Sequence, residues 1–462
     1  MATDRLYNFT DYNIQELQNS WFDAYRGKSK WLEQEYQGLQ GYRQKRTRLT
    51  MGVAKTASAE LANLLFSEPP QINCSDTVLK VLKENKFLKN TKNLSEYIAA
   101  LGGGAFKLRS DGEKIIIDYV KAYNIKPVTW DNKRVYEADF YSKKTIGDKV
   151  YQLVEKHRKA YEPVLEDEPT PDAKPRTQFV GYSIETQLLD DNNNQVPLPD
   201  DMIRYQIIPV KEPLFAYMTT SLANNFNPDS PEGISYFANA MDTLKALDIA
   251  FDSLYSEIEL GQKRIIVPSS ALRSVINPDT KRMEKYFDST DRVFMALKSD
   301  DDTNKLDIID NSVELRVDEI KSAIQTLLDI FCMQVGFSAG YLAFDGESVK
   351  TATEVISDNS KTFKTKAAFE NEIAEGMVDI MNSIKELLKE NSTDEFSVTF
   401  DDSVIEDRNS KQEYWSAMVT NGFATKLDAI MKIWGISEEE AQKKLDLIKA
   451  ETPTPSTAFV GL

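Results

Sequence analysis

Apolar residues recur at three- and four-residue spacing along much of the chain, which is the pattern of amphipathic helices. The spacing predicts helices within residues 12–66, at Ile234–Gly261, at residues 317–335 and at Thr351–Asn391. The last stretch, of some 40 residues, would be roughly 60 Å long if unbroken. Gly376 lies inside it and is a candidate for a bend.

Between residues 113 and 210 the pattern changes to short β-branched and aromatic runs, which are typical of strands. These runs predict an antiparallel sheet with strands at residues 114–120, 134–141, 150–155, 178–186 and 204–208. Shorter candidate strands lie at 264–268, 292–297 and 395–400, and helical spacing returns afterwards. The sequence therefore predicts an α+β fold that is mainly helical, with a very long helix and an antiparallel β region.

The composition limits the classes of protein to consider. With 462 residues and 41% hydrophobic residues, the chain can form two to four packed domains. Its formal net charge of −17 opposes tight, non-specific DNA binding, but it is compatible with a protein that lets DNA pass. Two cysteines are typical of a reducing compartment, and no apolar run is long enough for a membrane span or a signal segment.

The residues that usually carry catalysis or bind metals are scarce. The single histidine, His157, lies in a polar stretch and is expected to be solvated. The glycines at 102–104 lack phosphate-loop spacing and are expected at a turn or helix end. Residues 190–194 and 300–304 resemble calcium loops only faintly, because neither loop has glycine at its sixth position, and turns are favoured. We expect no catalytic residues, no metal and no cofactor.

A basic cluster stands out near the N-terminus. Arg43, Lys45, Arg46 and Arg48 follow one another closely, and a solvated helix face is the favoured interpretation. Contact with DNA or with an acidic neighbour is the alternative.

The most informative segment is an apolar, glycine-bearing loop between two predicted helices, residues 336–346. It exposes Phe337, Tyr341, Leu342 and Phe344 unless another part of the molecule covers them. Such a loop is suited to lining a binding site or holding a bound molecule.

Three segments resemble the portal proteins of tailed bacteriophages, most closely the subgroup from phages of Gram-positive hosts. They are Glu60–Pro70, Tyr119–Asp131, and Gly336-Phe-Ser-Ala-Gly-Tyr-Leu through Lys350-Thr-Ala-Thr-Glu-Val-Ile-Ser. The order of predicted elements fits that family over nearly the whole chain. The resemblance implies a non-enzymatic ring of twelve subunits at one capsid vertex, through which double-stranded phage DNA is packaged and ejected.

The resemblance also implies partners and a place in the cell. The ring would dock the terminase, the scaffold and major capsid protein, and the head–tail connector or adaptor protein. It would belong to the virion and assemble in the host cytoplasm, without a membrane.

By position, the resemblance divides the chain into the parts of a portal. The expected parts are the wing at 1–233, a stem helix at 234–261, the clip at 262–315, a second stem helix at 316–335, the tunnel loop at 336–350, the long wing helix and strand at 351–400, and the crown at 401–462. The residues expected to face DNA in the tunnel loop are Phe337, Ser338, Tyr341, Leu342, Phe344 and Lys350. Lys361 and Lys364 are candidates for DNA or inter-subunit contacts, with an ordinary helix-face salt bridge as the alternative.

Two other classes of function remain open at this point. Another structural head or adaptor protein of the virion would share the acidic composition without a DNA channel. An acidic hydrolase with paired carboxylates and a divalent metal is the third hypothesis, and metal-dependent cleavage of nucleic acid would support it.

Overall fold

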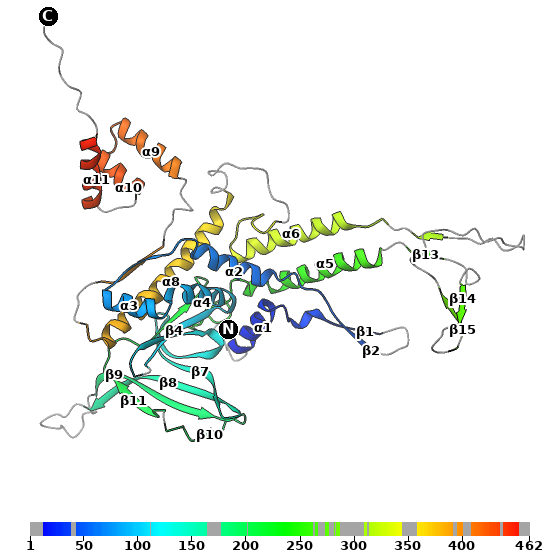
Figure 1. The fold of residues 1–462 in the computed structure, drawn as a ribbon, viewed down its shortest axis with the longest axis horizontal. Coiled ribbons are helices and arrows are strands. Elements are labelled where there is room, and N and C mark those ends of the chain that lie inside the picture. The colour runs from blue at the N-terminus through cyan, green and yellow to red at the C-terminus, as the bar shows by residue number, and fades with distance from the viewer. Residues whose placement is uncertain are drawn as a thin grey trace, which may run out of the picture. The chain divides into compact units, whose positions relative to one another are not determined.

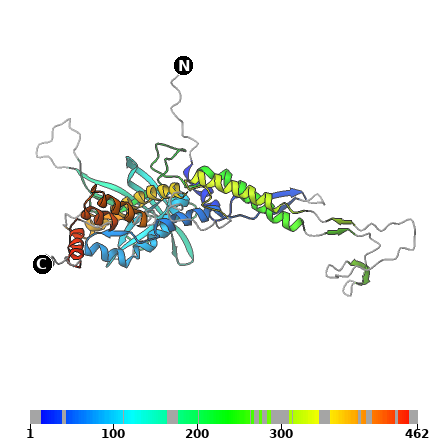
Figure 2. The same ribbon diagram turned by 90° about the horizontal axis from the view of Figure 1, so that it is seen from above.

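The computed structural model divides the chain into two compact units (Figures 1 and 2). The first comprises residues 1–30, 52–244 and 329–462, and the second comprises residues 31–51 and 245–328. The residues that the structure describes are 13–37, 43–110, 112–163, 177–200, 202–261, 264–266, 273–276, 281, 283–286, 309–311, 314–343, 358–390, 395–400, 408–434 and 438–451.

Four helices build the N-terminal part of the first unit: α1 (Ile14–Tyr25), α2 (Val53–Leu65), α3 (Asp76–Glu84) and α4 (Phe87–Leu101). Side chains that precede the helices cap two of them, since the side-chain amide oxygen of Asn13 accepts the Gln15 N–H and the Ser75 hydroxyl accepts the Val78 N–H. Helices α2 and α4 pack against each other. The predicted apolar stripe of α2, with Ala57 and Leu61, is buried as expected.

A three-stranded antiparallel sheet follows α4, in the order β12-β4-β5, formed by β12 (Phe215–Thr219), β4 (Gly103–Ser110) and β5 (Ile115–Lys121). Gly102 ends α4 with a φ of +88°, where a Cβ would crowd the Gly233 backbone. This confirms the expected helix end at the glycine run.

The outer edge of β5 is occupied by one side chain. The amide of Asn85 donates to the Ile115 carbonyl at 3.0 Å and accepts the Ile117 N–H at 2.9 Å. A strand edge otherwise presents free donors and acceptors. Here a side chain after α3 satisfies two of them.

Four of the five strands predicted between residues 113 and 210 lie in a six-stranded sheet (Figure 1), and the fifth, at residues 114–120, is β5 of the three-stranded sheet. Neighbouring strands pair in the order β10-β9-β8-β7-β6, and β11 also pairs with β9. The strands are β6 (Ile125–Asp131), β7 (Arg134–Ile146), β8 (Lys149–Pro163), β9 (Thr177–Leu189), β10 (Gln195–Val196) and β11 (Tyr205–Ile208). Asn132 and Lys133 adopt positive φ in the turn between β6 and β7. At the other turn, Asp190 Oδ1 accepts the Asn192 and Asn194 N–H groups at 2.9 and 2.8 Å.

His157 of β8 contradicts the expectation of a solvated histidine. Its side chain is 1% exposed and packs edge-on against Phe140 and Phe215, with ring centroids 5.0 and 5.7 Å away. Burial, together with the charges of Lys107 and Arg158, lowers the pKa of His157 to about 3. The polar neighbours in sequence point elsewhere because alternate residues of a strand face opposite sides of the sheet.

The long C-terminal helix is shorter than predicted at its end. Helix α8 (Ser360–Leu387) stops at Leu387 rather than Asn391, and residues 351–357 of the predicted helix lie outside the described part. It runs through Gly376 as regular helix. A Cβ there would overlap the Met218 side chain, so this glycine lets α8 approach β12 closely. The expected strand near 395–400 is β17 (Ser397–Thr399), which pairs with β3 (Gln71–Asn73).

The second unit begins with a β-hairpin where helix was predicted. Strands β1 (Glu33–Gln37) and β2 (Arg43–Thr47) pair antiparallel, with Glu33 opposite Thr47. The basic cluster therefore lies on and after a strand, not on a helix face. The three 3₁₀ turns of the described chain are η2 (Lys30–Leu32), η3 (Ala122–Asn124) and η4 (Ala238–Ala240).

Two long helices, α5 (Met241–Leu260) and α6 (Val317–Val335), lie side by side in both views (Figures 1 and 2). The predicted stripe of α6 is confirmed, since Ile324, Phe331 and Val335 are buried. The predicted helix from Ile234 begins only at Met241. In the described residues, no helix is both long and apolar enough to cross a bilayer.

Short strand pairs and a helical end complete the described chain. Strand β13 (Arg264–Ile266) confirms the first strand predicted after α5 and pairs with β16 (Ile309–Asn311), while β14 (Arg273–Ile276) pairs with β15 (Met283–Tyr286). The strand predicted at 292–297 lies outside the described residues. The predicted helical end comprises α9 (Arg408–Thr420), α10 (Lys426–Trp434) and α11 (Glu438–Glu451).

Candidate functional site

The loop after α6 begins with a tight helix end. Gly336 has a φ of +83°, and the Phe337 N–H bonds to the Cys332 carbonyl at 2.8 Å, which is the six-to-one bond of a Schellman motif. Thr365 of α8 donates to the Gly336 carbonyl at 2.6 Å. The start of the loop is therefore fixed by both the helix before it and the helix after it.

Phe337 and Ser338 are buried, which contradicts the expectation that Phe337 is exposed. Phe337 is 2% exposed and lies with Ala57 and Leu61 of α2 around a small internal cavity. The Ser338 N–H donates to the Thr362 hydroxyl at 2.8 Å, within the same core. The cover comes from α2 and α8, which are distant in sequence, and their packing places both side chains inside the subunit.

Tyr341 and Leu342 are half-buried, and Tyr341 is anchored. Its hydroxyl donates to Glu60 of α2 at 2.8 Å, and burial with this carboxylate raises the pKa of Tyr341. The Gly340 N–H donates to Asp329 of α6 at 3.1 Å. Ala339 and Gly340 are the first exposed residues of the loop, so any contact with a partner starts there.

The remaining predicted residues separate into two groups. Phe344 and Lys350 lie outside the described residues. Lys361 donates to the Met333 carbonyl at 2.9 Å. A cation is stabilising at this place because the C-terminal end of a helix, here α6, carries partial negative charge. Lys364 is exposed on α8. The structure thus brings Phe337, Ser338, Tyr341 and Lys361 together around the end of α6.

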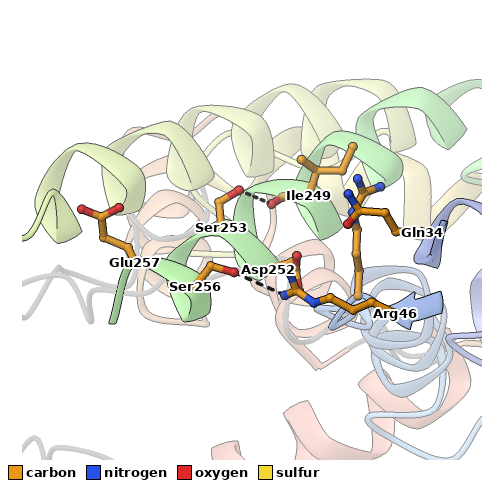
Figure 3. Close-up of a pocket in the computed structure, with 8 residues that line it drawn as sticks. Gln34, Arg46, Ile249, Asp252, Ser253, Ser256 and Glu257 are labelled. Carbon is orange, nitrogen blue, oxygen red and sulfur yellow. Dashed lines mark hydrogen bonds and ion pairs between the residues drawn. The ribbon is translucent and has the colours of Figure 1, made fainter. Parts of the chain in front are cut away.

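A second feature is a polar cleft in the second unit, between the β1–β2 hairpin and α5 (Figure 3). We call it the α5 cleft, and it has a volume of about 350 Å³. Its lining residues are Gln34, Arg46, Arg48, Ile249, Asp252, Ser253, Ser256 and Glu257.

Two buried carboxylates of α5 hold the segment of residues 31–51 in place. Asp248 accepts hydrogen bonds from the Trp31 indole, the Thr50 hydroxyl and the Met51 N–H, at 2.8, 2.9 and 2.9 Å. Asp252 accepts from Arg46 at 2.8 Å (Figure 3) and from the Leu49 N–H at 3.2 Å. Because they are one helical turn apart, both face the same side.

The prediction missed Asp248 and Asp252. A signal was present, since acids at this spacing interrupt the apolar stripe of Leu244, Leu247 and Phe251. Buried carboxylates are stable only with hydrogen-bond or ionic partners, so their position indicated a polar segment packed on α5.

The basic cluster has structural roles in this unit. Arg46 pairs with Asp252, Lys45 pairs with Glu35 across the hairpin at 3.3 Å, and Arg48 donates to the Trp31 carbonyl at 3.2 Å. The favoured interpretation, that these residues form a solvated helix face, is wrong for Arg46. An acidic neighbour within the same unit is what this arginine contacts.

The chemistry of the described residues is that of packing and docking. Within those residues, no group of three or more histidine, cysteine, aspartate or glutamate side chains could hold a metal ion. His157 packs against aromatic rings, and both cysteines are free thiols, with Cys332 buried and Cys74 partly buried.

Comparisons with known proteins identify one family. The model of the family described as "Phage portal protein, SPP1 Gp6-like" matches residues 10–454. No curated protein matches the chain.

Two solved structures are similar to the chain at low identity. A chain from the virion of a native gene transfer agent (GTA) particle is 11% identical, with a TM-score of 0.43, over 83% of this chain and 90% of that chain. A chain from the neck of a native GTA particle, computed with C12 symmetry, is 12% identical, with a TM-score of 0.45, over 82% of this chain and 89% of that chain.

Proposed function

The chain belongs to the SPP1 Gp6-like family of phage portal proteins, and from this premise we propose how its parts divide the work of a portal. It is a structural protein of the virion, placed at the capsid vertex through which phage DNA is packaged and ejected. The match of the family model over residues 10–454 carries this conclusion.

We propose that twelve copies form a ring around a DNA channel, with α5 and α6 as the stem. Apolar side chains that are exposed to solvent on a single subunit favour such an assembly. Tyr255 and Ile258 of α5 are 49% and 51% exposed, and Met333 of α6 is 61% exposed. Electron microscopy of the purified protein should show rings with a hole wide enough for duplex DNA, about 20 Å across. A protein that stays monomeric, even in capsid assembly reactions, would contradict the proposal.

The part of the tunnel loop that meets DNA is proposed to begin at Ala339 and to extend to residue 350. The burial of Phe337 and Ser338 supports this narrower assignment. The net charge of −17 opposes strong attraction between the wall and the phosphates, so DNA can move without a bound state. Replacing residues 339–344 with Gly and Ser should leave rings intact and impair packaging or retention of DNA.

The other parts follow the family order. Residues 1–233 and 351–400 would form the wing, and residues 401–462 the crown. Residues 262–315 would be the clip, which docks first the terminase and later the head–tail connector. Scaffold and major capsid protein would contact the outer ring during assembly in the host cytoplasm. Substitutions across residues 262–315 should weaken terminase or connector binding in pull-down assays, and unchanged docking would remove the clip assignment.

A further inference from the structure

Arg48 is a half-buried cation of the α5 cleft that has no counter-ion among the described residues of its own subunit. Its guanidinium donates one hydrogen bond, to the Trp31 carbonyl at 3.2 Å. Among the described residues, no carboxylate lies within ion-pair distance of it. A partly desolvated guanidinium has five N–H donors and is most stable opposite a carboxylate.

The acids beside Arg48 are already engaged. Asp252 pairs with Arg46 at 2.8 Å, and Glu257 pairs with Arg316 at 2.9 Å. The Gln34 amide, which also lines the cleft, makes no hydrogen bond to the described residues. The cleft therefore retains unused donors and about 350 Å³ of space, enough for a carboxylate side chain from outside.

The Glu257–Arg316 pair fixes which part of a neighbouring copy can reach the cleft. This ion pair places the start of α6 beside the part of α5 that lines the cleft. Rotation about the axis of a ring leaves each residue at its own height along that axis. The cleft of one subunit therefore faces residues that lie at the same height along the axis in the neighbouring subunit. At this level, Asp318 and Glu319 are exposed in the first turn of α6.

We propose that the α5 cleft is one half of a subunit interface and receives Asp318 or Glu319 from the neighbouring copy, which pairs with Arg48. The proposal rests on the ring assembly proposed above and names contacts within it. A DNA phosphate would satisfy the same donors, but Asp252 and Glu257 at the cleft oppose a polyanion. A single carboxylate brings one charge and suits a cleft of mixed charge.

The test measures ring formation by the full-length protein against protein concentration, using mass photometry and electron microscopy. Arg48→Ala should raise the concentration for half-maximal assembly by about tenfold or more, the effect of losing a desolvated interfacial charge pair. Arg48→Glu should raise it further. In the Arg48→Glu background, Asp318→Arg or Glu319→Arg should restore assembly to within about threefold of wild type.

Lys45→Ala is the matched control, because Lys45 is a cation of the same hairpin and its side chain is 76% exposed. This substitution should leave assembly unchanged. Rescue by a second charge reversal separates a contact from a folding defect, since misfolded subunits would not be restored. Unchanged assembly of Arg48→Ala, or an absent rescue with both α6 variants, overturns the proposal. Normal assembly with weakened DNA retention would instead assign Arg48 to phosphate. If the wild-type protein forms no rings, the proposed function fails first.

Discussion

The carboxylate of Asp248 accepts the indole N–H of Trp31 at 2.8 Å, joining residues 217 positions apart in the chain. The same carboxylate also accepts from Thr50 and Met51. One side chain of α5 thus anchors both ends of the segment that carries the β1–β2 hairpin.

Asp248→Ala should destabilise the second unit by about 2–4 kcal/mol, because three partly buried donors lose their acceptor. Urea unfolding followed by tryptophan fluorescence measures this, since Trp31 reports on the contact. Glu259→Ala, an exposed acid of the same helix, is the control and should change stability by less than about 0.5 kcal/mol. Equal effects of the two substitutions would refute the anchoring role.

His157 should make the protein less stable in mild acid. Its folded-state pKa is lowered to about 3, whereas in the unfolded chain it keeps an ordinary value near 6.5. Below that unfolded value only the unfolded chain takes up the proton, so stability falls as pH falls, by about 1.4 kcal/mol per pH unit, until pH 3.

Between pH 7 and pH 4.5 the loss due to His157 should be about 2–3 kcal/mol. His157→Phe keeps an aromatic ring between Phe140 and Phe215 and removes the titration, so its stability should vary less over this range. Chemical unfolding at several pH values compares the two proteins. If their slopes agree, the histidine does not carry the dependence.

Phe337 should behave as a core residue. Phe337→Ala should lower the free energy of unfolding by about 3–5 kcal/mol, because a side chain 2% exposed is lost and a cavity remains. Phe423→Ala, at a position 76% exposed, should be nearly neutral. Thermal unfolding distinguishes them. A neutral Phe337→Ala that still blocks DNA packaging would return Phe337 to the channel wall.

Gly376 should resist even the smallest substitution. A Cβ at this position overlaps Met218, so Gly376→Ala should cost about 1–3 kcal/mol, although alanine favours helix elsewhere. The pair of substitutions Gly376→Ala and Met218→Ala should cost less than the sum of the two single changes, because the shortened side chain removes the overlap. Additive costs in denaturant unfolding would show that the two residues do not share this contact.

Elements with a strong period of their own were predictable from the sequence. The stripe of α6 and the strands β7, β8, β9 and β11 of the six-stranded sheet lie where local patterns indicated. The hairpin at residues 33–47 was not predictable from the sequence. Its strands, Glu-Gln-Glu-Tyr-Gln and Arg-Gln-Lys-Arg-Thr, carry no alternation of apolar and polar residues. Their hairpin is held by Asp252, more than 200 positions away, and such contacts leave no local signal.

The same reason explains the errors at the loop. An apolar loop is exposed unless something covers it, and Phe337 is covered by α2, about 280 residues earlier, as the Tyr341–Glu60 bond also shows. Glycine was also ambiguous, since Gly376 suggested a bend but serves close packing. Sequence patterns place the helices around the loop, while tertiary packing decides which side of it faces the solvent.

The amide of Asn85 has a consequence for how copies of this protein can meet. By satisfying the Ile115 carbonyl and the Ile117 N–H, it prevents another strand from adding to the outer edge of β5 at that point. Strand addition is open-ended, since each added chain offers a fresh edge, and it leads towards fibrils. A protein that must gather in many copies and stop at a closed number gains from an edge that its own side chain has already filled.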